Sequence, residues 1–225
     1  MNLQASPPQA RVSIEAGPSV PRVRRPLRYA VGVAILRLTG WRVRVKLPDE
    51  PKMIIIVAPH TSNWDFLFGI AAIFALQLPI HWFAKHTLFQ GLPGRFFRRL
   101  GGLPVDRSAP GGLVTQTANL FRDHEQLLLA ITPEGTRSRQ PRWKRGFYHI
   151  AVEAQVPIAV GYLDFGRRLA GIDTVFRPSG DWDRDMAEVL AFYATNRGSA
   201  VYVGTYDRTN DILRVDRSNT EAAHA

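Results

Sequence analysis

The sequence predicts a single α/β domain with a mostly parallel or mixed sheet and helices on both faces. Short apolar runs alternate along the chain with longer helical patterns, as in strand-helix units. Several of the short runs are apolar throughout, which is typical of strands buried on both faces. No internal repeat and no long low-complexity linker divides the 225 residues, so one domain is favoured over two.

The first predicted strand-helix unit begins with the β-branched run at 53–57, which indicates a buried strand. Ser62 or Asn63 can cap the helix that follows over 64–78, and Pro79 ends it. From Phe66 to Leu78 this helix is apolar around its whole circumference. The next three elements are short: a strand at 81–84, a basic helix at 94–100 ended by Gly101, and an extended piece at 103–105.

The alternation continues in the second half of the chain. Four elements are predicted in order: a helix at 112–122, a strand at 126–131, a helix at 146–154 and a strand at 158–163. A strand near Thr174, a helix at 182–193 and a strand at 200–206 complete the series, with no indication of how the last strands pair.

The two ends of the chain lack the apolar periodicity of its middle and are expected to be disordered or flexible. Residues 1–26 are expected to form a disordered basic arm, because the first 20 contain Pro, Ser and Gly without apolar periodicity. Residues 216–225 are expected to form a flexible tail. We place the catalytic or binding domain at 49–215.

Between the arm and the domain, residues 27–48 form a possible interfacial membrane-binding segment. The apolar run Tyr29–Leu36 is far shorter than the roughly 20 residues of a spanning helix. No acid occurs among the surrounding cations, which are Arg22, Arg24, Arg25, Arg28, Arg37, Arg42, Arg44 and Lys46. Such a segment can lie in the headgroup layer of an anionic membrane. The alternative is a solvated basic arm with a small apolar anchor docked on the domain.

Composition narrows the chemistry. The net charge of +10 indicates an anionic partner, which leaves nucleic acid, a phospholipid surface and a phosphorylated substrate open. With no cysteine, the chain has no disulfide, no thiolate nucleophile and no Cys-ligated zinc or iron-sulfur site. A secretory signal is not expected, because about 25 mostly polar residues precede the apolar run. We therefore expect a cytoplasmic protein.

Ligands of open α/β sheets bind outside the carboxyl ends of the strands, so the segments after each strand are the candidate sites. After the first strand, Asp65 follows His60 by five residues and can turn back onto the imidazole. A carboxylate that accepts from one ring nitrogen leaves the other available as a general base. The alternative is that both residues only cap the helix.

Two later segments add candidate anion-binding groups. Arg107 follows the extended piece at 103–105 and can fork onto a phosphate or pair with a surface acid. After the strand at 126–131 come Thr132-Pro133-Glu134-Gly135-Thr136-Arg137-Ser138, then Arg139, Arg142, Lys144 and Arg145. Amides, hydroxyls and cations at a strand end form a plausible anion cradle, although solvated charge runs are commoner.

These motifs, in this order, resemble the glycerolipid acyltransferase family, which includes the 1-acyl-sn-glycerol-3-phosphate acyltransferases. The blocks are His-x4-Asp, Gly-x-x-x-Val-Asp-Arg, Pro-Glu-Gly-Thr-Arg-Ser and Val156-Pro157-Ile158, within residues 50–165. The resemblance implies a glycerol-3-phosphate acyltransferase-like fold. It also implies transfer of an acyl group from acyl-CoA or acyl-carrier protein to a lysophospholipid hydroxyl, most simply that of 1-acyl-sn-glycerol-3-phosphate, giving phosphatidate.

The resemblance also implies a role for each block. His60 would be the general base and Asp65 would orient it, while Arg107 would hold the acceptor phosphate. The acceptor site would be shaped by Glu134, Gly135, Thr136 and Arg137, with Lys144 as a further substrate-binding cation. No cofactor or metal is implied beyond the acyl donor, because a thioester is already activated.

The chain departs from the common family pattern in three places. Pro59 stands where Asn is common, Thr132 where an aromatic residue is common, and Leu103-Pro104-Val105 where Phe and Ile are common. The acceptor is therefore open between lysophosphatidate, another lysolipid and another lipid alcohol. The apolar helix at 64–78 suits burial in the core or an acyl-chain pocket.

Other functional classes receive less support. A non-catalytic module of the same fold that binds anionic lipid is the main alternative. A serine hydrolase lacks its Gly-x-Ser-x-Gly elbow, and His124-Glu125 lacks the second histidine of a zincin motif. A nucleic-acid partner is not expected, because most aromatic residues lie in apolar runs rather than among the cations. The expected location is the membrane surface, as a peripheral protein.

Overall fold

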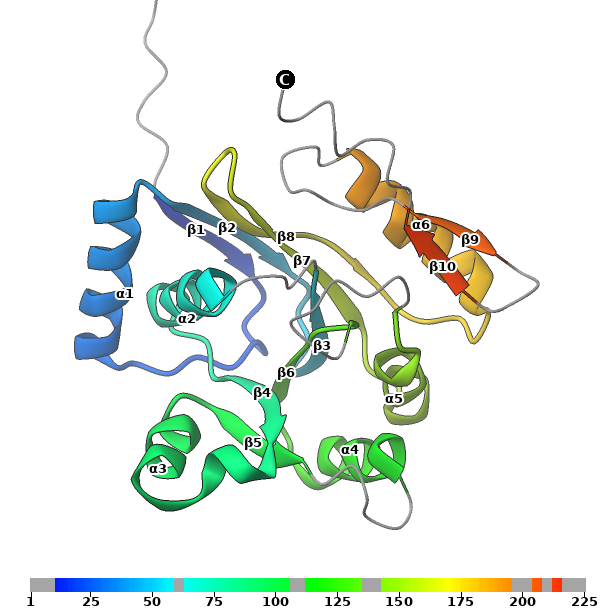
Figure 1. The fold of residues 1–225 in the computed structure, drawn as a ribbon, viewed down its shortest axis with the longest axis horizontal. Helices are drawn as coiled ribbons and strands as arrows, with labels where there is room; N and C mark the ends of the chain where they lie inside the picture. The colour runs from blue at the N-terminus through cyan, green and yellow to red at the C-terminus, as the bar shows by residue number, and fades with distance from the viewer. Residues whose placement is uncertain are drawn as a thin grey trace, which may run out of the picture.

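The computed structural model describes residues 11–58, 63–105, 112–134, 143–195, 204–207 and 212–215. Its centre is an eight-stranded mixed sheet with the strand order β1-β2-β8-β7-β3-β6-β4-β5 (Figure 1). The predicted α/β class, with a mixed sheet and helices on both faces, is therefore confirmed.

The sheet consists of two groups of strands that run in opposite directions. Five strands are mutually parallel: β7 (Ile158–Asp164), β3 (Lys52–Val57), β6 (Leu127–Ile131), β4 (Ile80–Lys85) and β5 (Gly102–Val105). The other three are β8 (Leu169–Phe176), β2 (Arg42–Leu47) and β1 (Val12–Ala16). The groups join where β7 pairs with β8 in antiparallel fashion.

Helices cover both faces of the sheet. One face carries α1 (Pro26–Thr39) and α2 (Asn63–Leu76), and the other carries α4 (Gly112–Asp123), α5 (Gly146–Ala154) and α6 (Trp182–Thr195) (Figure 1). The short η1 (His86–Phe89) and α3 (Gly91–Arg99) follow β4 and pack beside β5. A separate antiparallel pair, β9 (Gly204–Asp207) and β10 (Ile212–Val215), lies near the C-terminus.

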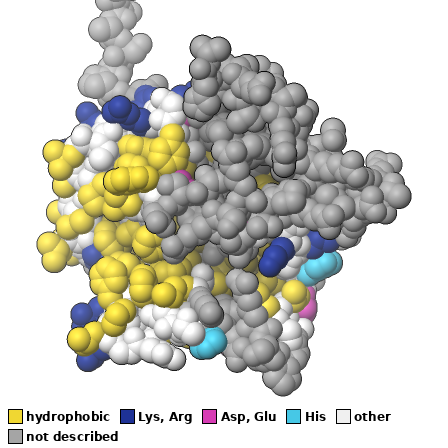
Figure 2. Space-filling view, viewed as in Figure 1, with side chains coloured by type: hydrophobic (Ala, Val, Ile, Leu, Met, Phe, Trp, Pro, Cys, Tyr) yellow, Lys and Arg dark blue, Asp and Glu magenta, His cyan; other side chains and the backbone are white. Residues whose placement is uncertain are grey.

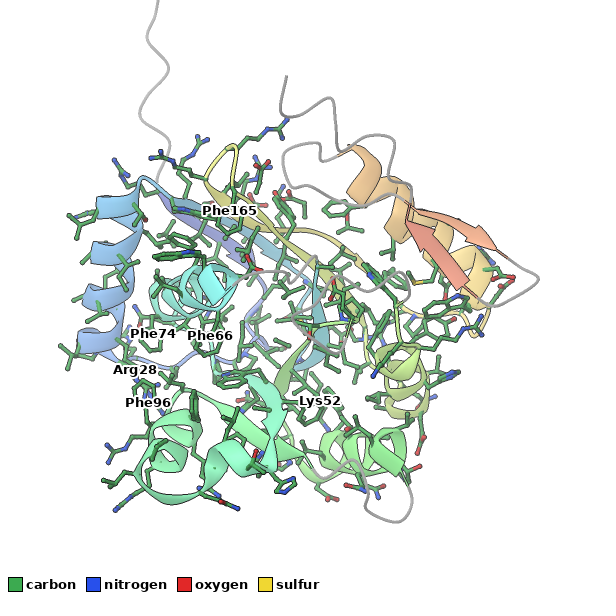
Figure 3. The ribbon with its side chains drawn as sticks, viewed as in Figure 1. Arg28, Lys52, Phe66, Phe74, Phe96 and Phe165 are labelled. Carbon is green, nitrogen blue, oxygen red and sulfur yellow. The ribbon has the colours of Figure 1, made fainter. Side chains whose placement is uncertain are left out.

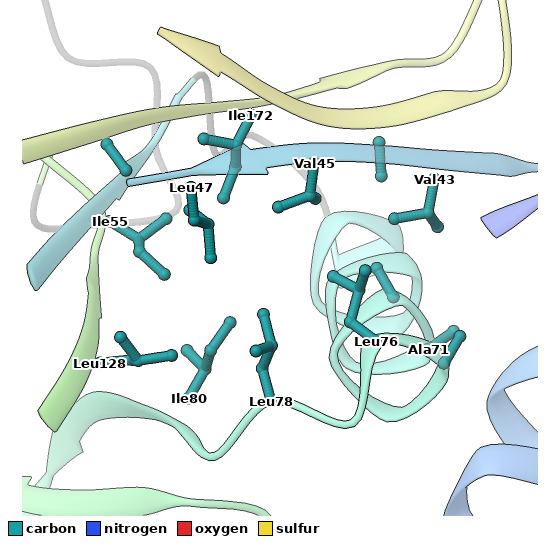
Figure 4. Close-up of a cluster of buried hydrophobic side chains, with 14 of the residues drawn as sticks. Val43, Val45, Leu47, Ile55, Ala71, Leu76, Leu78, Ile80, Leu128 and Ile172 are labelled. Atoms are coloured by element: carbon teal, nitrogen blue, oxygen red, sulfur yellow. The ribbon is translucent and has the colours of Figure 1, made fainter. Parts of the chain in front are cut away.

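The core has two layers, one on each side of β3. Met53 and Ile55 point into the layer beneath α1 and α2, which also contains Val43, Val45, Leu76 and Ile172 (Figure 4). Ile54 and Ile56 point the other way, toward α4, α5 and α6. Because both faces are covered, the strand is apolar at successive positions, as its sequence predicted.

Residues at the two ends of α1 start and stop the helix, and one glycine within it allows close packing against α2. Pro26 stands in its first turn and Gly40 ends it with φ of 75°, a left-handed conformation that glycine adopts without strain. Gly32 faces α2, where an added Cβ would lie 2.6 Å from the carbonyl oxygen of Ala71. The two helices therefore approach closely because position 32 has no side chain. No helix among the described residues combines the length and the hydropathy needed to cross a bilayer.

The structure corrects the expectations for the N-terminal region. Within the arm predicted to be disordered, Val12–Ala16 forms β1, and β1 pairs with β2 in parallel. The segment proposed as interfacial, 27–48, contains α1 and then β2, in which Val43, Val45 and Leu47 are buried while Arg42, Arg44 and Lys46 are exposed. Alternating cations thus occupy the solvent face of a strand. The folded domain begins well before residue 49, and residues 1–10 and 216–225 lie outside the described residues.

Candidate active site

The parallel strands bring the candidate segments to one edge of the sheet. In the ladders Ile56 lies beside Ile131, Trp82 beside Ala130, and Lys85 beside Val105. The carboxyl ends of β3, β6, β4 and β5 therefore meet at the same edge, in that order. This is the edge at which open α/β sheets bind their ligands.

Asp65 is a buried carboxylate at this edge. It lies in the first turn of α2, directly after the connection from β3, and its residue is 4% exposed. Its neighbour Trp64 is 62% exposed, so the chain turns Asp65 inward and Trp64 outward.

A second buried carboxylate, Glu134, follows the neighbouring strand. Its residue is 5% exposed, and Pro133 before it is also buried. Since β3 and β6 are adjacent, the segments that carry Asp65 and Glu134 leave the sheet side by side. Burying a charge is costly unless it is paired and hydrogen-bonded. Two buried acids at one strand edge therefore indicate a candidate functional site.

Lys144, which follows the Gly-Thr-Arg block in the sequence, lies at the same edge of the sheet as Pro133. Its backbone N–H donates a 2.8 Å hydrogen bond to the carbonyl oxygen of Pro133, while its side chain is exposed. Beyond it, the guanidinium of Arg145 lies over the ring of Trp182 at 4.7 Å from the centroid. One cation of the predicted cradle is therefore held against an aromatic ring of α6.

Five of the predicted site residues lie outside the described residues: His60, Arg107, Gly135, Thr136 and Arg137. The described residues on either side of each gap fix where the chain enters and leaves it. His60 stands between Ala58, which follows β3, and Asn63, the first residue of α2. Arg107 stands two residues beyond Val105, the end of β5, and before Gly112, where α4 begins.

An aromatic cluster that the sequence did not predict lies beside the first turn of α2. Trp41 stacks on Phe68 with ring centroids 4.2 Å apart, and Phe165 meets Trp41 edge-on at 5.0 Å. Trp64 and Phe165 are 62% and 45% exposed, so the cluster reaches the surface. Its members come from three separate segments, and only tertiary packing brings them together.

No group of three histidine or acidic side chains that could hold a metal ion occurs among the parts of the chain that the structure describes. The described site therefore consists of two buried carboxylates, a backbone hydrogen bond that joins Lys144 to Pro133, and an exposed aromatic surface, all at the carboxyl edge of parallel strands.

This arrangement defines the class of the chain as an α/β domain with its candidate site at a strand-end edge. The comparison with protein families then gives the family. The model of the Acyltransferase family matches residues 42–160, which are 119 of the 225 residues, and the chain belongs to this family.

Named relatives agree with this assignment. The chain is 26% identical over 157 residues to a 1-acyl-sn-glycerol-3-phosphate acyltransferase of Limnanthes douglasii, covering 66% of this chain and 54% of the relative. It is 28% identical over 142 residues to the alpha form of Homo sapiens, covering 57% and 49%. A Bacillus subtilis relative of the same name is 32% identical over 106 residues, covering 46% and 52%. The chain thus spans about half the length of these relatives.

A solved structure shares the fold. The crystal structure of the 1-acyl-sn-glycerophosphate acyltransferase PlsC from Thermotoga maritima matches with a TM-score of 0.52, covering 76% of each chain at 19% identity. At this identity the likeness supports the fold alone.

Proposed function

We propose that the chain transfers an acyl group from acyl-CoA or acyl-carrier protein to the free hydroxyl of a lysophospholipid, with 1-acyl-sn-glycerol-3-phosphate as the first acceptor to test. The observation that carries the proposal is the burial of Asp65 in the first turn of α2, directly after the connection that contains His60. Relatives that share the family are named for this reaction.

In the proposed mechanism, His60 takes the proton of the acceptor hydroxyl while Asp65 holds the imidazole in the required tautomer. The hydroxyl oxygen attacks the thioester carbonyl, and a tetrahedral oxyanion forms. Its collapse breaks the carbon-sulfur bond, and the departing thiolate receives the proton from the imidazolium. The ester and the free thiol balance the reaction without a covalent enzyme intermediate, so the chain needs no cysteine.

The proposed acceptor site lies along the same edge. Arg107 would hold the phosphate, because a guanidinium pairs with two phosphate oxygens at once. β5, which precedes Arg107, is three strands from β3, which is roughly 14 Å at the usual strand spacing. An arginine side chain is too short to cross that distance alone, so an acceptor with its phosphate at Arg107 would extend back toward His60. The segment after β6, which lies between β3 and β5 in the sheet, would complete the acceptor site. Its proposed contributors are Glu134, Gly135, Thr136, Arg137 and Lys144.

We further propose that the protein works as a peripheral protein on an anionic membrane, where its acceptor resides. Exposed apolar side chains on the face formed by α1, α2 and α3 support this (Figure 2). They include Leu27 and Leu38 on α1, which are 78% and 87% exposed. A contiguous exposed apolar patch marks a protein or membrane interaction site, whereas apolar residues scattered singly do not.

The central experiment compares the parent chain with His60→Ala and, as a matched control, His149→Ala on the exposed side of α5. Thioester consumption is measured with lysophosphatidate as acceptor. Loss of a general base predicts a decrease in turnover of about 10²- to 10⁴-fold for His60→Ala, and little change for the control. Equal turnover of all three proteins would remove His60 from the mechanism, and no thioester consumption by the parent would favour a non-catalytic lipid-binding module of the same fold.

The acceptor is tested with Arg107→Lys. A lysine keeps the positive charge but loses the fork that binds two oxygens, so we expect a higher KM for lysophosphatidate and an unchanged KM for the acyl donor. Parallel assays with lysophosphatidylcholine and with a neutral monoacylglycerol measure how much recognition depends on the terminal phosphate. A chain that uses all acceptors equally, with or without Arg107, would contradict the proposed phosphate contact.

A further inference from the structure

A pocket of about 150 Å³ lies at the opposite end of α2 from Asp65. It opens where the first turn of α1, the end of α2 and the end of α3 meet, beside the beginning of β4. Among its lining residues are Arg25, Arg28, Phe74, Arg98 and Arg99. A water molecule occupies about 30 Å³ in the liquid, so the pocket has room for a phosphate group.

The pocket is strongly cationic, and none of the described residues that line it compensates its charge. Four arginines line it, and no acidic residue does so within the described ranges. Within the described parts of the chain, Arg25, Arg28 and Arg99 form no ion pair. Burial and the neighbouring cations Arg25 and Arg99 lower the pKa of the Arg28 guanidinium below its usual value. These like charges repel one another in the folded protein, and an anion between them would relieve that repulsion.

Two of the guanidinium groups are held in place by aromatic rings. The guanidinium carbon of Arg28 lies 5.3 Å from the ring centroid of Phe74, and that of Arg98 lies 5.4 Å from Phe89. Arg98 also donates a 3.0 Å hydrogen bond to the carbonyl oxygen of Phe89. Figure 3 shows Arg28 reaching from α1 toward Phe74 of α2, with Phe96 of α3 nearby in the same view. Preorganised guanidinium groups lose less freedom when they bind an anion.

Exposed apolar side chains occur on the two helices that form the mouth of the pocket. Leu27 on α1 is 78% exposed, while Leu92 and Phe96 on α3 are 80% and 58% exposed. Figure 2 shows hydrophobic side chains gathered over α1, α2 and α3, with Lys and Arg side chains at the rim. Cations beside exposed apolar groups are the combination that binds the interface of an anionic bilayer.

We infer that this pocket binds the phosphate of an anionic membrane phospholipid, while Leu27, Leu92 and Phe96 enter the interfacial layer around it. The site is distinct from the proposed acceptor site, because Asp65 and Gln77 stand at opposite ends of α2, about 18 Å apart at the rise of an α-helix. The inference rests on the proposed work at a lipid surface. It concerns attachment to that surface rather than turnover.

The test measures partition of the full chain onto sedimented vesicles, without acyl donor. One set of vesicles is phosphatidylcholine alone, and the other contains about a third phosphatidylglycerol. The pocket variant carries Arg28→Gln and Arg99→Gln. The matched control carries Arg42→Gln on β2 and Arg184→Gln on α6, two exposed positions outside the pocket, so both proteins lose the same net charge.

We expect the pocket variant to bind the anionic vesicles about thirtyfold more weakly, since each arginine near such a surface contributes about 1 kcal/mol and 1.4 kcal/mol is tenfold. The control should lose less than about threefold. A third variant, Leu92→Ser with Phe96→Ser, should bind both kinds of vesicle more weakly. Thermal unfolding of each variant shows whether a loss comes from misfolding.

Equal losses in the pocket variant and the control would overturn the inference, because they would show attraction by net charge alone. It would also be overturned if inorganic phosphate bound the pocket as tightly as the vesicles did, since the ligand would then be a free phosphate compound. Asp65→Asn is included as a reference that should keep full vesicle binding. Loss of turnover in Asp65→Asn with intact vesicle binding would concern only the proposed reaction. Loss of vesicle binding in the pocket variant with intact turnover would concern only the pocket.

Discussion

The backbone N–H of Lys144 is bonded to the carbonyl oxygen of Pro133 at 2.8 Å, across the Gly-Thr-Arg block that separates them. This bond joins the end of β6 to the segment before α5, so the two ends of the block are held together at the strand edge. The described residues on either side of the block, Pro133 and Lys144, are therefore fixed relative to each other.

This relationship predicts different effects for two substitutions of Lys144. Lys144→Pro removes the donated N–H and should lower the free energy of unfolding by about 1 to 3 kcal/mol, together with turnover. Lys144→Ala keeps the N–H, so its stability should stay within about 0.5 kcal/mol of the parent, and any change in acceptor KM reports the ammonium group. Urea unfolding and acceptor titrations provide both measurements. Equal stability of the two variants would contradict the structural role of the bond.

Asp65→Asn tests the proposed orientation of His60. An amide can hold the imidazole in the wrong tautomer, so turnover should fall by several orders of magnitude while the far-UV circular dichroism spectrum is unchanged. Asp183→Asn is the matched control, because Asp183 also lies in the first turn of a helix but is exposed. Comparable activity of the two variants would exclude Asp65 from the mechanism.

The close approach of α1 and α2 predicts opposite effects of two alanine substitutions. Gly32→Ala places a Cβ 2.6 Å from the Ala71 carbonyl oxygen, and overpacking of this kind typically costs about 1 to 3 kcal/mol. At Gly69, on α2, an added Cβ meets nothing within 4 Å. Gly69→Ala should therefore stabilise the protein by about 0.5 to 1 kcal/mol through helix propensity. Denaturant midpoints of the two variants should move in opposite directions.

Tyr148→Phe tests a buried polar network beneath α6. The Tyr148 hydroxyl donates a 2.7 Å hydrogen bond to Asp185, which also accepts from the backbone and hydroxyl of Ser179. Burial, together with Asp185, raises the pKa of Tyr148 to about 12. Removing the hydroxyl leaves a buried carboxylate oxygen with one donor fewer, so stability should fall by about 1 to 3 kcal/mol. A midpoint equal to that of the parent would show that water replaces the lost donor.

The burial of His81 predicts that the free energy of unfolding decreases at acid pH. Burial lowers the pKa of His81 below its ordinary value of 6.5, against the opposing effect of its hydrogen bond to the Gly101 backbone. The unfolded chain therefore binds a proton at a pH where the folded chain does not, and stability falls as pH falls through the unfolded pKa. His81→Gln should flatten this slope below about pH 6.5. Unfolding curves at a series of pH values give the slope, and an unchanged slope would count against His81.

The sequence predicted the parallel half of the sheet because each of those strands is a local apolar run. The run at 53–57 is the clearest example, since a strand buried on both faces is recognisable without its neighbours. The direction of β8 was not predictable, because its pairing with β7 depends on contacts rather than on its own pattern. β2 was missed for a different reason: its six positions alternate cation and apolar residue, and the cations were interpreted as a basic arm. β1 was missed because the Pro, Ser and Gly residues around it were interpreted as disorder.

For the candidate site, the sequence placed the candidate segments at the carboxyl ends of the parallel strands, and the structure buries two of their residues there, Asp65 and Glu134. It did not indicate the Trp41–Phe68 stack or the arginine pocket, because both are assembled from segments far apart in the chain. The roles of His60 and Arg107 stay predictions that the variants above test.

The position of β2 has a consequence for how the protein is made. Among the described strands its neighbours in the sheet are β1 and β8, and β8 is synthesised long after β2 leaves the ribosome. Until then the backbone N–H and C=O groups on one edge of β2 have no strand partner, and such delayed pairing slows folding and exposes chains to aggregation. Nascent chains halted before residue 169 should therefore depend on a chaperone or on the bilayer itself for shelter.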